Sequence, residues 1–598
     1  MPFLCLLVLW LLNTVSAQYP PAPDGVTVLN SSVITGARIQ YKEPGLCETT
    51  PGVKSYSGYI KLPAGSLQDT GVSQNYDINL FFWYFRARKA PGSAPLGVWL
   101  TGGPGASSTK GIFQENGPCF VNADSRSTRL NPWSWNREVN MLYIDQPVQS
   151  GLSYDRLVNG TLDLFTDRLS RLSIPNFKRG KNVKQTTSML VGTFPSNNYA
   201  TTTNTSANAA KALWHAMQVF LNDFPESKSS DSRVSIWSES YGGRYGPRSA
   251  AFFQRQNEKI QAGKLQNKAY KPINLDALGI VAGCVDKLTE GISATKYAYN
   301  NTFGLRIVNE AAVRQAEQGW PSCQSALVRC KQAVEGSDPE NTGANSQVNS
   351  VCMSAFQSCS GPRFGDRSAY DIAAPTQDPD PHPYMIGYLA RQDVQKALGV
   401  PVNYTEVIES VNQVFTKTGD MNRPGPMDDL AYLLDNGIKV HMMYGDRDGT
   451  CNWIGGETVS LAIKHREKSE FKSAGYGELK TNSSYTGGSV RQHNGLSFAL
   501  VFQAGHSVPW YQPQTAYEVF RRATSNLDIA TGTVPTAKSG GGSTYSSRGA
   551  PNALGVSHVL PPMPKPTCYL LMLQATCPSG IEAKLRLGQA LIKDYIVS

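Results

Sequence analysis

Three polar side chains in this chain follow apolar segments and are of the types needed for nucleophilic catalysis. Ser240 follows the run 234–237, Asp448 follows 438–444, and His506 follows 496–502. A serine hydroxyl is a weak nucleophile until an imidazole takes its proton, and the imidazole needs a carboxylate that fixes its tautomer. Together the three residues predict acyl transfer through a serine nucleophile.

The elements that must position these residues are buried strands. Each apolar run is short and is followed by turn residues, a pattern typical of strands covered on both faces. An antiparallel start (56–62 and 78–88) precedes strands that we expect to end at Leu100, Asp145, Ser240, Gly283, Gly445 and Gly505. The chain order Ser, Asp, His at strand ends predicts an α/β-hydrolase fold, with a mixed doubly wound sheet and Ser240 on a strand-to-helix turn.

Alternatives exist for each of the three residues. A Ser-x-Gly turn is usually plain loop chemistry, and Ser238 stands where the usual elbow has glycine. Asp446 precedes Asp448 by two residues and is a rival for the carboxylate role. The chain has seven histidines, and among them only His506 follows a strand within a glycine-flanked turn.

A glycine-rich segment resembles the signature of a known protein family. Residues 99–108, Trp-Leu-Thr-Gly-Gly-Pro-Gly-Ala-Ser-Ser, resemble the signature of the serine carboxypeptidases, peptidase family S10, which includes yeast carboxypeptidase Y. The resemblance extends from about residue 47 to 513, and the opening 47–53 looks like the branch of fungal carboxypeptidase S1. Further matching motifs lie at 115–118, 131–136, 145–147, 239–245, 445–448 and 504–509.

The resemblance implies a role for each member of the triad. Ser240 would attack the scissile carbonyl, His506 would act as general base and then acid, and Asp448, rather than Asp446, would orient His506. The oxyanion hole would consist of the backbone N–H groups of Gly103 and Tyr241. The segment from about 285 to 424, where no strand is expected, resembles the family's helical insertion that caps the active site.

The same resemblance implies a site for the substrate's terminal carboxylate. Glu115 and Glu239 match the two family glutamates, whereas Thr101 stands where the family has asparagine. Two carboxyl groups facing a third carboxylate must share a proton, so binding is expected to be favoured below neutral pH. Cys451 resembles the family's free active-site thiol, and Ser507 replaces an apolar residue; both are assigned to the leaving-group pocket.

The cysteine spacing indicates an oxidising compartment. Two equal Cys-x6-Cys intervals suit a nested pairing that staples a helical hairpin, and they are too wide for common zinc sites, so no metal is expected. Two further pairs are suggested, although the sequence does not fix connectivity. Cys284 has no obvious partner. The candidate disulfides are Cys323–Cys359, Cys330–Cys352, Cys47–Cys119 and Cys568–Cys577.

The ends of the chain fit a secretory route. Residues 1–17 read as a signal peptide, residues 18–540 as the catalytic domain, and residues 541–598 as a Gly/Ser/Pro-rich linker with a C-terminal segment. No other stretch predicts a transmembrane helix. We expect a secreted protein, with vacuolar or cell-wall location as the alternative. Six sequons offer candidate glycosylation sites: Asn30, Asn159, Asn204, Asn300, Asn403 and Asn482.

These observations predict a serine carboxypeptidase that releases C-terminal amino acids from peptides and proteins and needs no cofactor. The net charge of +10 is not concentrated in long basic runs, so nucleic acid is not an expected partner. The alternatives are a family-related acyltransferase and a secreted binding protein without activity. The sequence leaves the oligomeric state open.

Overall fold

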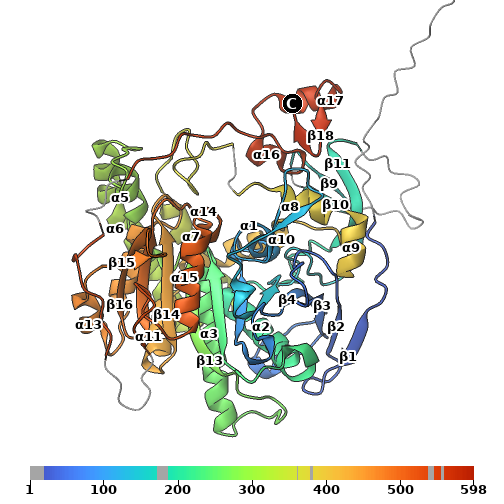
Figure 1. Cartoon of the computed structure of the whole chain (residues 1–598), viewed down its shortest axis with the longest axis horizontal. Helices are drawn as coiled ribbons and strands as arrows, with labels where there is room; N and C mark the ends of the chain where they lie inside the picture. The colour runs from blue at the N-terminus through green and yellow to red at the C-terminus, as the bar shows by residue number, and fades with distance from the viewer. Residues whose placement is uncertain are drawn as a thin grey trace, which may run out of the picture.

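The computed structural model describes residues 19–166, 168–171, 186–359, 361–377, 381–536, 544–553 and 558–598 (Figure 1). The expected signal peptide, residues 1–17, lies outside the described residues. No helix in the described part of the chain is both long and apolar enough to span a bilayer.

A twelve-stranded mixed sheet forms the centre of the molecule. Its middle strands, from β8 to β17, are parallel, and antiparallel strands extend it at both edges. This is the doubly wound arrangement that the sequence predicts. In spatial order the strands are β1 (Thr27–Asn30), β2 (Arg38–Lys42), β3 (Ser55–Leu62), β4 (Ile78–Phe85), β8 (Asn140–Ile144), β5 (Leu96–Leu100), β12 (Val234–Glu239), β13 (Leu275–Val281), β14 (Lys439–Gly445), β17 (Leu496–Val501), β16 (Thr486–His493) and β15 (Gly477–Lys480).

The central strands are apolar throughout because both of their faces are covered. In β5, Val98 points into one core cluster and Trp99 into the other, and both are buried. Trp99 pairs in register with Trp237 of β12, which in turn pairs with Gly279 of β13. A Cβ on Gly279 would lie 2.1 Å from the Trp237 ring, so glycine is what allows the large indole to lie flat across the sheet.

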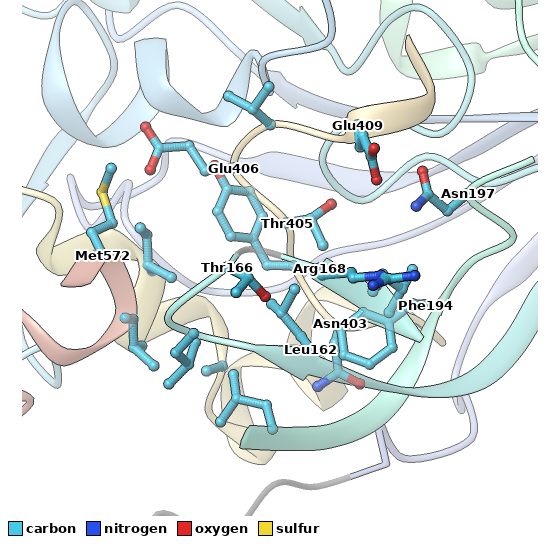
Figure 2. Close-up of a pocket in the computed structure, with 18 of the residues that line it drawn as sticks. Leu162, Thr166, Arg168, Phe194, Asn197, Asn403, Thr405, Glu406, Glu409 and Met572 are labelled. Carbon is cyan, nitrogen blue, oxygen red and sulfur yellow. The ribbon is translucent and has the colours of Figure 1, made fainter. Parts of the chain in front are cut away.

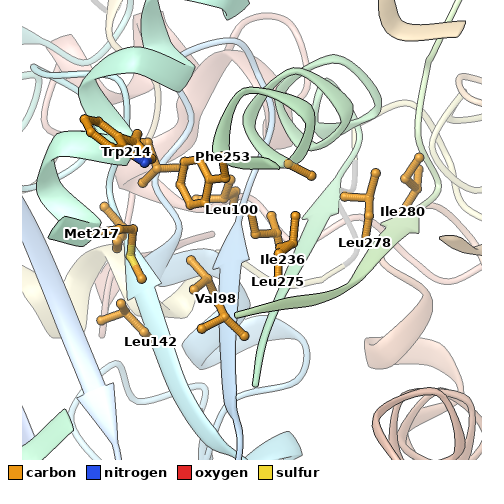
Figure 3. Close-up of a cluster of buried hydrophobic side chains, with 14 of the residues drawn as sticks. Val98, Leu100, Leu142, Trp214, Met217, Ile236, Phe253, Leu275, Leu278 and Ile280 are labelled. Carbon is orange, nitrogen blue, oxygen red and sulfur yellow. The ribbon is translucent and has the colours of Figure 1, made fainter. Parts of the chain in front are cut away.

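Helices cover both faces of the sheet. Figure 3 shows one face, where Trp214 and Phe253 pack over Val98, Leu100 and Ile236. The helices whose side chains enter this cluster are α2 (Ser206–Asp223), α3 (Gly242–Gln261), α5 (Ser293–Tyr299), α11 (Pro426–Asp435), α12 (Trp453–Ala462) and α13 (Lys468–Ser473). The opposite face is covered by α1 (Thr109–Gln114), α8 (Tyr384–Leu389), α9 (Gln392–Leu398), α14 (Val508–Tyr511) and α15 (Pro513–Thr524).

The segment 285–424 is helical, and its described residues add no strand to any sheet. Its longest helix, α6 (Glu310–Ser337), packs against α7 (Ser346–Ser358), and two nested disulfides join them, Cys323–Cys359 and Cys330–Cys352. These are the pairs expected from the equal spacing. The segment also contains α8 and α9, together with α4 (Lys287–Glu290), α5 (Ser293–Tyr299) and α10 (Glu409–Thr418).

Smaller sheets lie at one side of the domain. The strands β10, β9 and β11 form a three-stranded sheet, β6 and β7 a hairpin, and β18 and β19 another. A disulfide, Cys47–Cys119, ties β6 to the N-terminal region. The strands are β6 (Cys119–Val121), β7 (Thr128–Leu130), β9 (Leu157–Asp163), β10 (Arg168–Arg171), β11 (Met189–Pro195), β18 (Ile592–Lys593) and β19 (Ile596–Val597).

The C-terminal region is packed more closely than a linker would be. Residues 545–550 lie along β15 and β16, where Ser546 bridges to His493 and Ala550 to Tyr476. Residues 568–598, here named the C-terminal module, contain α16 (Leu573–Thr576), α17 (Ile581–Arg586) and the expected disulfide Cys568–Cys577. The module shares a core cluster with β9 and β11 and lies beside them in Figure 1. The expected linker is therefore, in its described part, an ordered strap across the domain.

Candidate active site

Ser240 lies in the sharp turn between β12 and α3. Its φ of 62° is in the left-handed region, which residues other than glycine seldom adopt, as expected for a strained nucleophile turn. Its backbone N–H donates to the carbonyl of Val281 at 3.1 Å. Ser238 Oγ donates to the carbonyl of Gly242 at 2.9 Å, and a Cβ on Gly246 would lie 2.2 Å from that Oγ. The helix glycines thus make room for Ser238 where the usual elbow has glycine.

His506 and Asp448 are brought together by the adjacent strands β17 and β14. His506 Nδ1 lies 2.7 Å from Asp448 Oδ2, and Asp448 is fully buried. The other carboxylate oxygen, Oδ1, accepts the backbone N–H groups of Thr450 at 2.8 Å and Cys451 at 3.2 Å. His506 Nε2 has no hydrogen-bond partner among the described residues. The imidazole is therefore oriented through one nitrogen, and the other is available for a proton.

The charge of Asp448 sets the proton affinity of His506. Burial by itself lowers the pKa of the imidazole, but the charge and hydrogen bond of Asp448, with a further contribution from Glu239, raise it above its ordinary value. The imidazole is thus a stronger base than a free histidine.

Asp446 is buried as completely as Asp448 but faces different groups. Its Oδ1 accepts the backbone N–H of Ala504 at 3.2 Å, in the loop that carries His506. Its Oδ2 is 3.7 Å from Nε2 of His558, a residue of the C-terminal strap. Burial raises the pKa of Asp446 to about 8, so it is a neutral carboxylic acid below that pH. It contacts the His506 loop, not the imidazole.

The glycine-rich turn after β5 lies against the Ser240 turn. A Cβ on Gly102 would be 2.3 Å from the backbone nitrogen of Tyr241, and Gly103 has a φ of 105° that favours glycine. Asp145 Oδ1 anchors the far end of this turn by accepting from Ser107 Oγ and from the backbone N–H of Ser108, each at 2.7 Å. The backbone groups of Gly103 and Tyr241 are consequently held on adjoining segments beside the serine.

Two buried carboxyl groups lie together next to this turn. Glu115, at the end of α1, is 1% exposed, and Glu239, the last residue of β12, is 3% exposed. Burial, then the charge of Glu239 and a hydrogen bond to it, raise the pKa of Glu115 well above its ordinary range. Both Glu115 oxygens lack any other hydrogen-bond partner among the described residues. Burial and the charge of Glu239 thus favour the protonated form of Glu115, which has unused hydrogen-bonding capacity for a ligand.

Thr101 begins the glycine-rich turn and is buried. Its Oγ1 accepts the indole N–H of Trp99 at 3.0 Å, and its backbone N–H donates to Ser108 Oγ at 3.1 Å. A threonine hydroxyl has one proton, so Thr101 can donate a single hydrogen bond to a ligand while it accepts from Trp99.

Comparison with known proteins identifies the family that carries this arrangement. The family model of serine carboxypeptidases matches residues 44–526. The chain belongs to the serine carboxypeptidase family. It is 48% identical over 597 residues to carboxypeptidase S1 homolog B of Arthroderma otae, covering 97% of this chain and 90% of that protein. It is 34% identical to carboxypeptidase S1 of Penicillium janthinellum, covering 82% and 99% of the two chains.

A solved structure supports the fold independently. The structure of Kex1Δp, a prohormone-processing carboxypeptidase from Saccharomyces cerevisiae, matches with a TM-score of 0.58 at 19% identity, covering 83% of this chain and 95% of that one. The predicted α/β-hydrolase fold is confirmed, and the protein is a serine-type carboxypeptidase. Residues 527–598 lie beyond the family match.

One charged residue of this carboxypeptidase site was missed from the sequence. Lys110, on α1, pairs with Glu406 of the insertion at 2.9 Å. Burial lowers the pKa of Lys110, but the carboxylate of Glu406, followed by Glu239 and Glu115, raises it above its ordinary value. A fixed positive charge therefore lies near the two glutamates. Glu406 is 296 residues from Lys110 in sequence, so no local pattern could pair them.

The expectation for Cys451 was wrong. Cys451 is bonded to Cys284 in a disulfide with a Cα–Cα distance of 5.0 Å, so it is not a free thiol. The cause is the sheet order: β13 and β14 are parallel neighbours, and each cysteine follows the end of its strand. Cys284, which had no partner in the sequence analysis, thereby acquires one, and the bond ties the Asp448 loop to the segment after β13.

Ser507 has a specific polar contact beside His506. Its Oγ donates to Glu239 Oε1 at 3.3 Å, so the side chain faces the glutamate pair. This hydrogen bond links Ser507, which follows His506, to Glu239, which precedes Ser240.

The six sequons differ in their accessibility. Asn204 and Asn403 are half-buried, and their side chains accept hydrogen bonds, from Asn208 Nδ2 at 2.8 Å and from the backbone N–H of Thr193 at 2.8 Å, respectively. The other four are exposed and remain candidate glycosylation sites: Asn30, Asn159, Asn300 and Asn482.

Proposed function

We propose that the carboxypeptidase works through an acyl-enzyme formed on Ser240, with His506 as base and acid and Asp448 as the orienting carboxylate. The observation that carries this proposal is the 2.7 Å contact between His506 Nδ1 and Asp448 Oδ2, which follow strands β17 and β14 of the same sheet whose strand β12 leads into the strained Ser240 turn. This arrangement supplies a nucleophile, a base and a fixed tautomer, which serine acyl transfer requires.

The chemical steps follow from those positions. The Ser240 oxygen bonds to the carbonyl carbon while its proton passes to His506 Nε2, and the negative oxygen of the intermediate is received by the N–H groups of Gly103 and Tyr241. The C–N bond then breaks, and His506 returns the proton to the leaving amine. Water repeats the sequence on the ester and restores the free serine.

Glu115, Glu239 and Thr101 are proposed to restrict cleavage to the last residue of a peptide. A protonated Glu115 can donate to the substrate's terminal carboxylate, and the Thr101 hydroxyl can add one more donor. Because the proton on Glu115 is needed, KM is expected to rise as pH increases through its raised pKa. Because His506 must be neutral, kcat is expected to fall as pH decreases through its own raised pKa.

A secretory route is proposed for this enzyme, with vacuolar or cell-wall delivery as the alternative. Five disulfides among the described residues favour an oxidising compartment, and four exposed sequons suit passage through it. Peptide mapping of the purified protein would test this by locating the mature N-terminus and any glycans.

The proposed mechanism is tested by labelling and by substrate release. An organophosphonate probe should modify Ser240, and Ser240→Ala should lower kcat by several orders of magnitude. Ser238→Ala is the matched control, because Ser238 is two residues away and fully buried. Free-acid peptides should lose one C-terminal residue at a time, and C-terminally amidated peptides should be poor substrates. Labelling at another serine would contradict the assignment.

A further inference from the structure

A disulfide joins the two segments that support the nucleophile and the carboxylate of the proposed triad. The Cys284–Cys451 bond connects the chain after β13 to the chain after β14, and its cysteines are 167 residues apart in sequence. The resemblance to the family implied a free thiol at Cys451, so this bond is a departure of this chain from that pattern. The backbone contacts of the two cysteines show what the bond holds in place.

The segment that ends in Cys284 holds the backbone of Ser240 on both sides. The N–H of Ser240 donates to the carbonyl of Val281 at 3.1 Å, and the N–H of Cys284 donates to the carbonyl of Ser240 at 3.0 Å. Helix α3 begins directly against the same segment, because a Cβ on Gly243 would lie 2.6 Å from the carbonyl oxygen of Cys284. The strained turn at Ser240 is therefore maintained by residues 281–284.

The segment that contains Cys451 holds the carboxylate of Asp448. Asp448 Oδ1 accepts the backbone N–H groups of Thr450 at 2.8 Å and of Cys451 at 3.2 Å, which leaves Oδ2 for His506. Asp448 is fully buried, so the orientation of its carboxylate depends on these protein donors. A movement of the Cys451 backbone would therefore change the direction in which Oδ2 faces the imidazole.

The disulfide reaches further along the β14 segment than the hydrogen bonds that precede it. The N–H of Ala282 donates to the carbonyl of Met443 at 2.8 Å, and the hydroxyl of Tyr444 donates to the carbonyl of Gly283 at 2.6 Å. Both of these contacts lie before the Asp448 loop, whereas the disulfide joins the loop itself. The bond thus links the residues that support Ser240 directly to those that support Asp448.

We propose that the Cys284–Cys451 disulfide is a positioning device for catalysis, which fixes the distance between the Ser240 turn and the Asp448 loop, and that opening it with a thiol reductant lowers turnover. The proposal rests on the triad proposed above. Two thiols need more room than two bonded sulfurs, so reduction moves the two segments apart. A displacement on the order of 1 Å in a catalytic group can cost about 100-fold in rate. Glu115 and Glu239 lie outside both segments, so substrate binding is expected to persist.

The reduction itself is a thiol–disulfide exchange with a dithiol. Cys284 is half-buried and Cys451 is 5% exposed, so the reagent reaches the sulfur of Cys284 first. Its thiolate bonds to Cys284 Sγ while the S–S bond breaks, and Cys451 leaves as a thiolate that then takes a proton. The second thiol of the reagent displaces Cys284. The protein gains two thiols, and the dithiol is oxidised to a cyclic disulfide.

A second disulfide offers a control for the loss of a cross-link. Cys568–Cys577 lies in the C-terminal module, which packs against β9 and β11, strands of a different sheet from β13 and β14. Figure 2 shows Met572 of this module at a cavity of about 990 Å³, which is walled mainly by β9–β11, α8, residues 403–412 and the module itself. Removal of this bond therefore tests for general effects at a distance from the triad.

The proposal is tested by opening the bond in two ways. In the double variant Cys284→Ser/Cys451→Ser, kcat per active site for a free-acid peptide should fall about tenfold to 100-fold, while KM changes by less than about twofold. Active sites are counted by titration to completion with an organophosphonate that labels Ser240. The control Cys568→Ser/Cys577→Ser should keep the wild-type kcat per active site.

The second way uses the folded wild-type protein. Treatment with a dithiol, followed by alkylation and peptide mapping, should lower kcat in proportion to the fraction of Cys284 and Cys451 that becomes alkylated. The double variant Cys284→Ser/Cys451→Ser has no such bond, so its kcat should not respond to the dithiol.

A disulfide that only stabilises the fold would give a different pattern. The double variant would then have fewer labelled sites, and each remaining site would keep the wild-type kcat. That pattern would overturn the proposal, as would an unchanged kcat after Cys284 and Cys451 are alkylated, or an equal loss per site in Cys568→Ser/Cys577→Ser. Absence of labelling at Ser240 in the untreated wild type would instead refute the proposed triad.

Discussion

Replacing Asp448 with asparagine is expected to reverse the tautomer of His506. Asp448 uses one oxygen to accept two backbone N–H groups and the other to accept from His506 Nδ1. Asparagine has one oxygen and one amide nitrogen. If its oxygen stays with the two backbone donors, its NH₂ group faces Nδ1, which must then become an acceptor. The ring proton moves to Nε2, and that atom can no longer take the proton of Ser240.

The size of the loss can be worked out from the contact distance. A carboxylate 2.7 Å from an imidazolium interacts by about 6 kcal/mol at an effective dielectric constant of 20. A loss of that order in transition-state stabilisation corresponds to about 10⁴-fold in kcat. The reduction expected for a triad with the wrong tautomer is also about 10⁴-fold. The variant should therefore retain about 0.01% of turnover with little change in KM.

Asp446→Asn is the matched control, since Asp446 is equally buried and only two residues away. With a pKa of about 8, Asp446 is already neutral at pH 5 and pH 7, so replacing it with a neutral amide should change kcat by less than about tenfold. The folded state holds this proton while the unfolded state releases it near pH 4, so wild-type stability is lost as pH rises toward 8. Asparagine removes that loss. The free energy of unfolding of Asp446→Asn minus that of the wild type should therefore be about 2–3 kcal/mol greater at pH 7 than at pH 5.

The assay is steady-state release of the C-terminal residue from a free-acid peptide, combined with thermal unfolding at pH 5 and pH 7. Labelling of each variant with an organophosphonate reports whether Ser240 is still activated. A kcat loss in Asp446→Asn that equals or exceeds the loss in Asp448→Asn would refute the reasoning. So would a folded Asp448→Asn enzyme with more than about 1% of wild-type turnover.

Three further substitutions address recognition of the terminal carboxylate. Glu115→Gln fixes a neutral donor, so KM for free-acid peptides should become nearly constant from about pH 5 to pH 8. If KM rose with pH as it does in the wild type, the idea of a shared proton would be wrong. In Thr101→Asn the asparagine side chain can accept from Trp99 and still donate through its amide. The kcat/KM for free-acid peptides should therefore improve by about 1–2 kcal/mol of transition-state binding, with esters unaffected. Equal effects on both substrate classes would indicate a structural role. Glu406→Gln leaves the Lys110 charge uncompensated near the site. KM for free-acid peptides should then fall about threefold to tenfold, while KM for esters stays the same. An unchanged KM for free-acid peptides would exclude this effect.

The sequence by itself determined the elements and the residues placed at their ends. Short apolar runs predicted the ends of five central strands within two residues, because strands buried on both faces must be apolar along their whole length, whereas β17 ends at Val501, four residues before the expected Gly505. The positions of Ser240, Asp448 and His506 followed from those runs. The nested disulfides were predictable for a related reason: equal spacing on two facing helices places each pair of cysteines side by side.

Only the tertiary structure decided contacts between segments far apart in the chain. Cys284 and Cys451 are 167 residues apart, and the order of parallel strands, which local patterns do not encode, brings them together. The same holds for the pair formed by Lys110 and Glu406. Such contacts depend on how the sheet and the covering helices pack, and many other residues in the chain have a local sequence that would suit the same partner.

The raised pKa of Asp446 and the packed C-terminal strap also belong to the folded molecule. A sequence shows that Asp446 is acidic, but only burial, which outweighs the charge of the adjacent Arg447 and the backbone N–H groups, raises its pKa to about 8 and makes it neutral at pH 7. The region after residue 540 has the composition of a linker, yet residues 545–550 lie along the sheet edge and the C-terminal module packs against β9 and β11. Composition indicates which segments are weakly constrained locally, and the available edges and apolar surfaces of the fold decide where they pack.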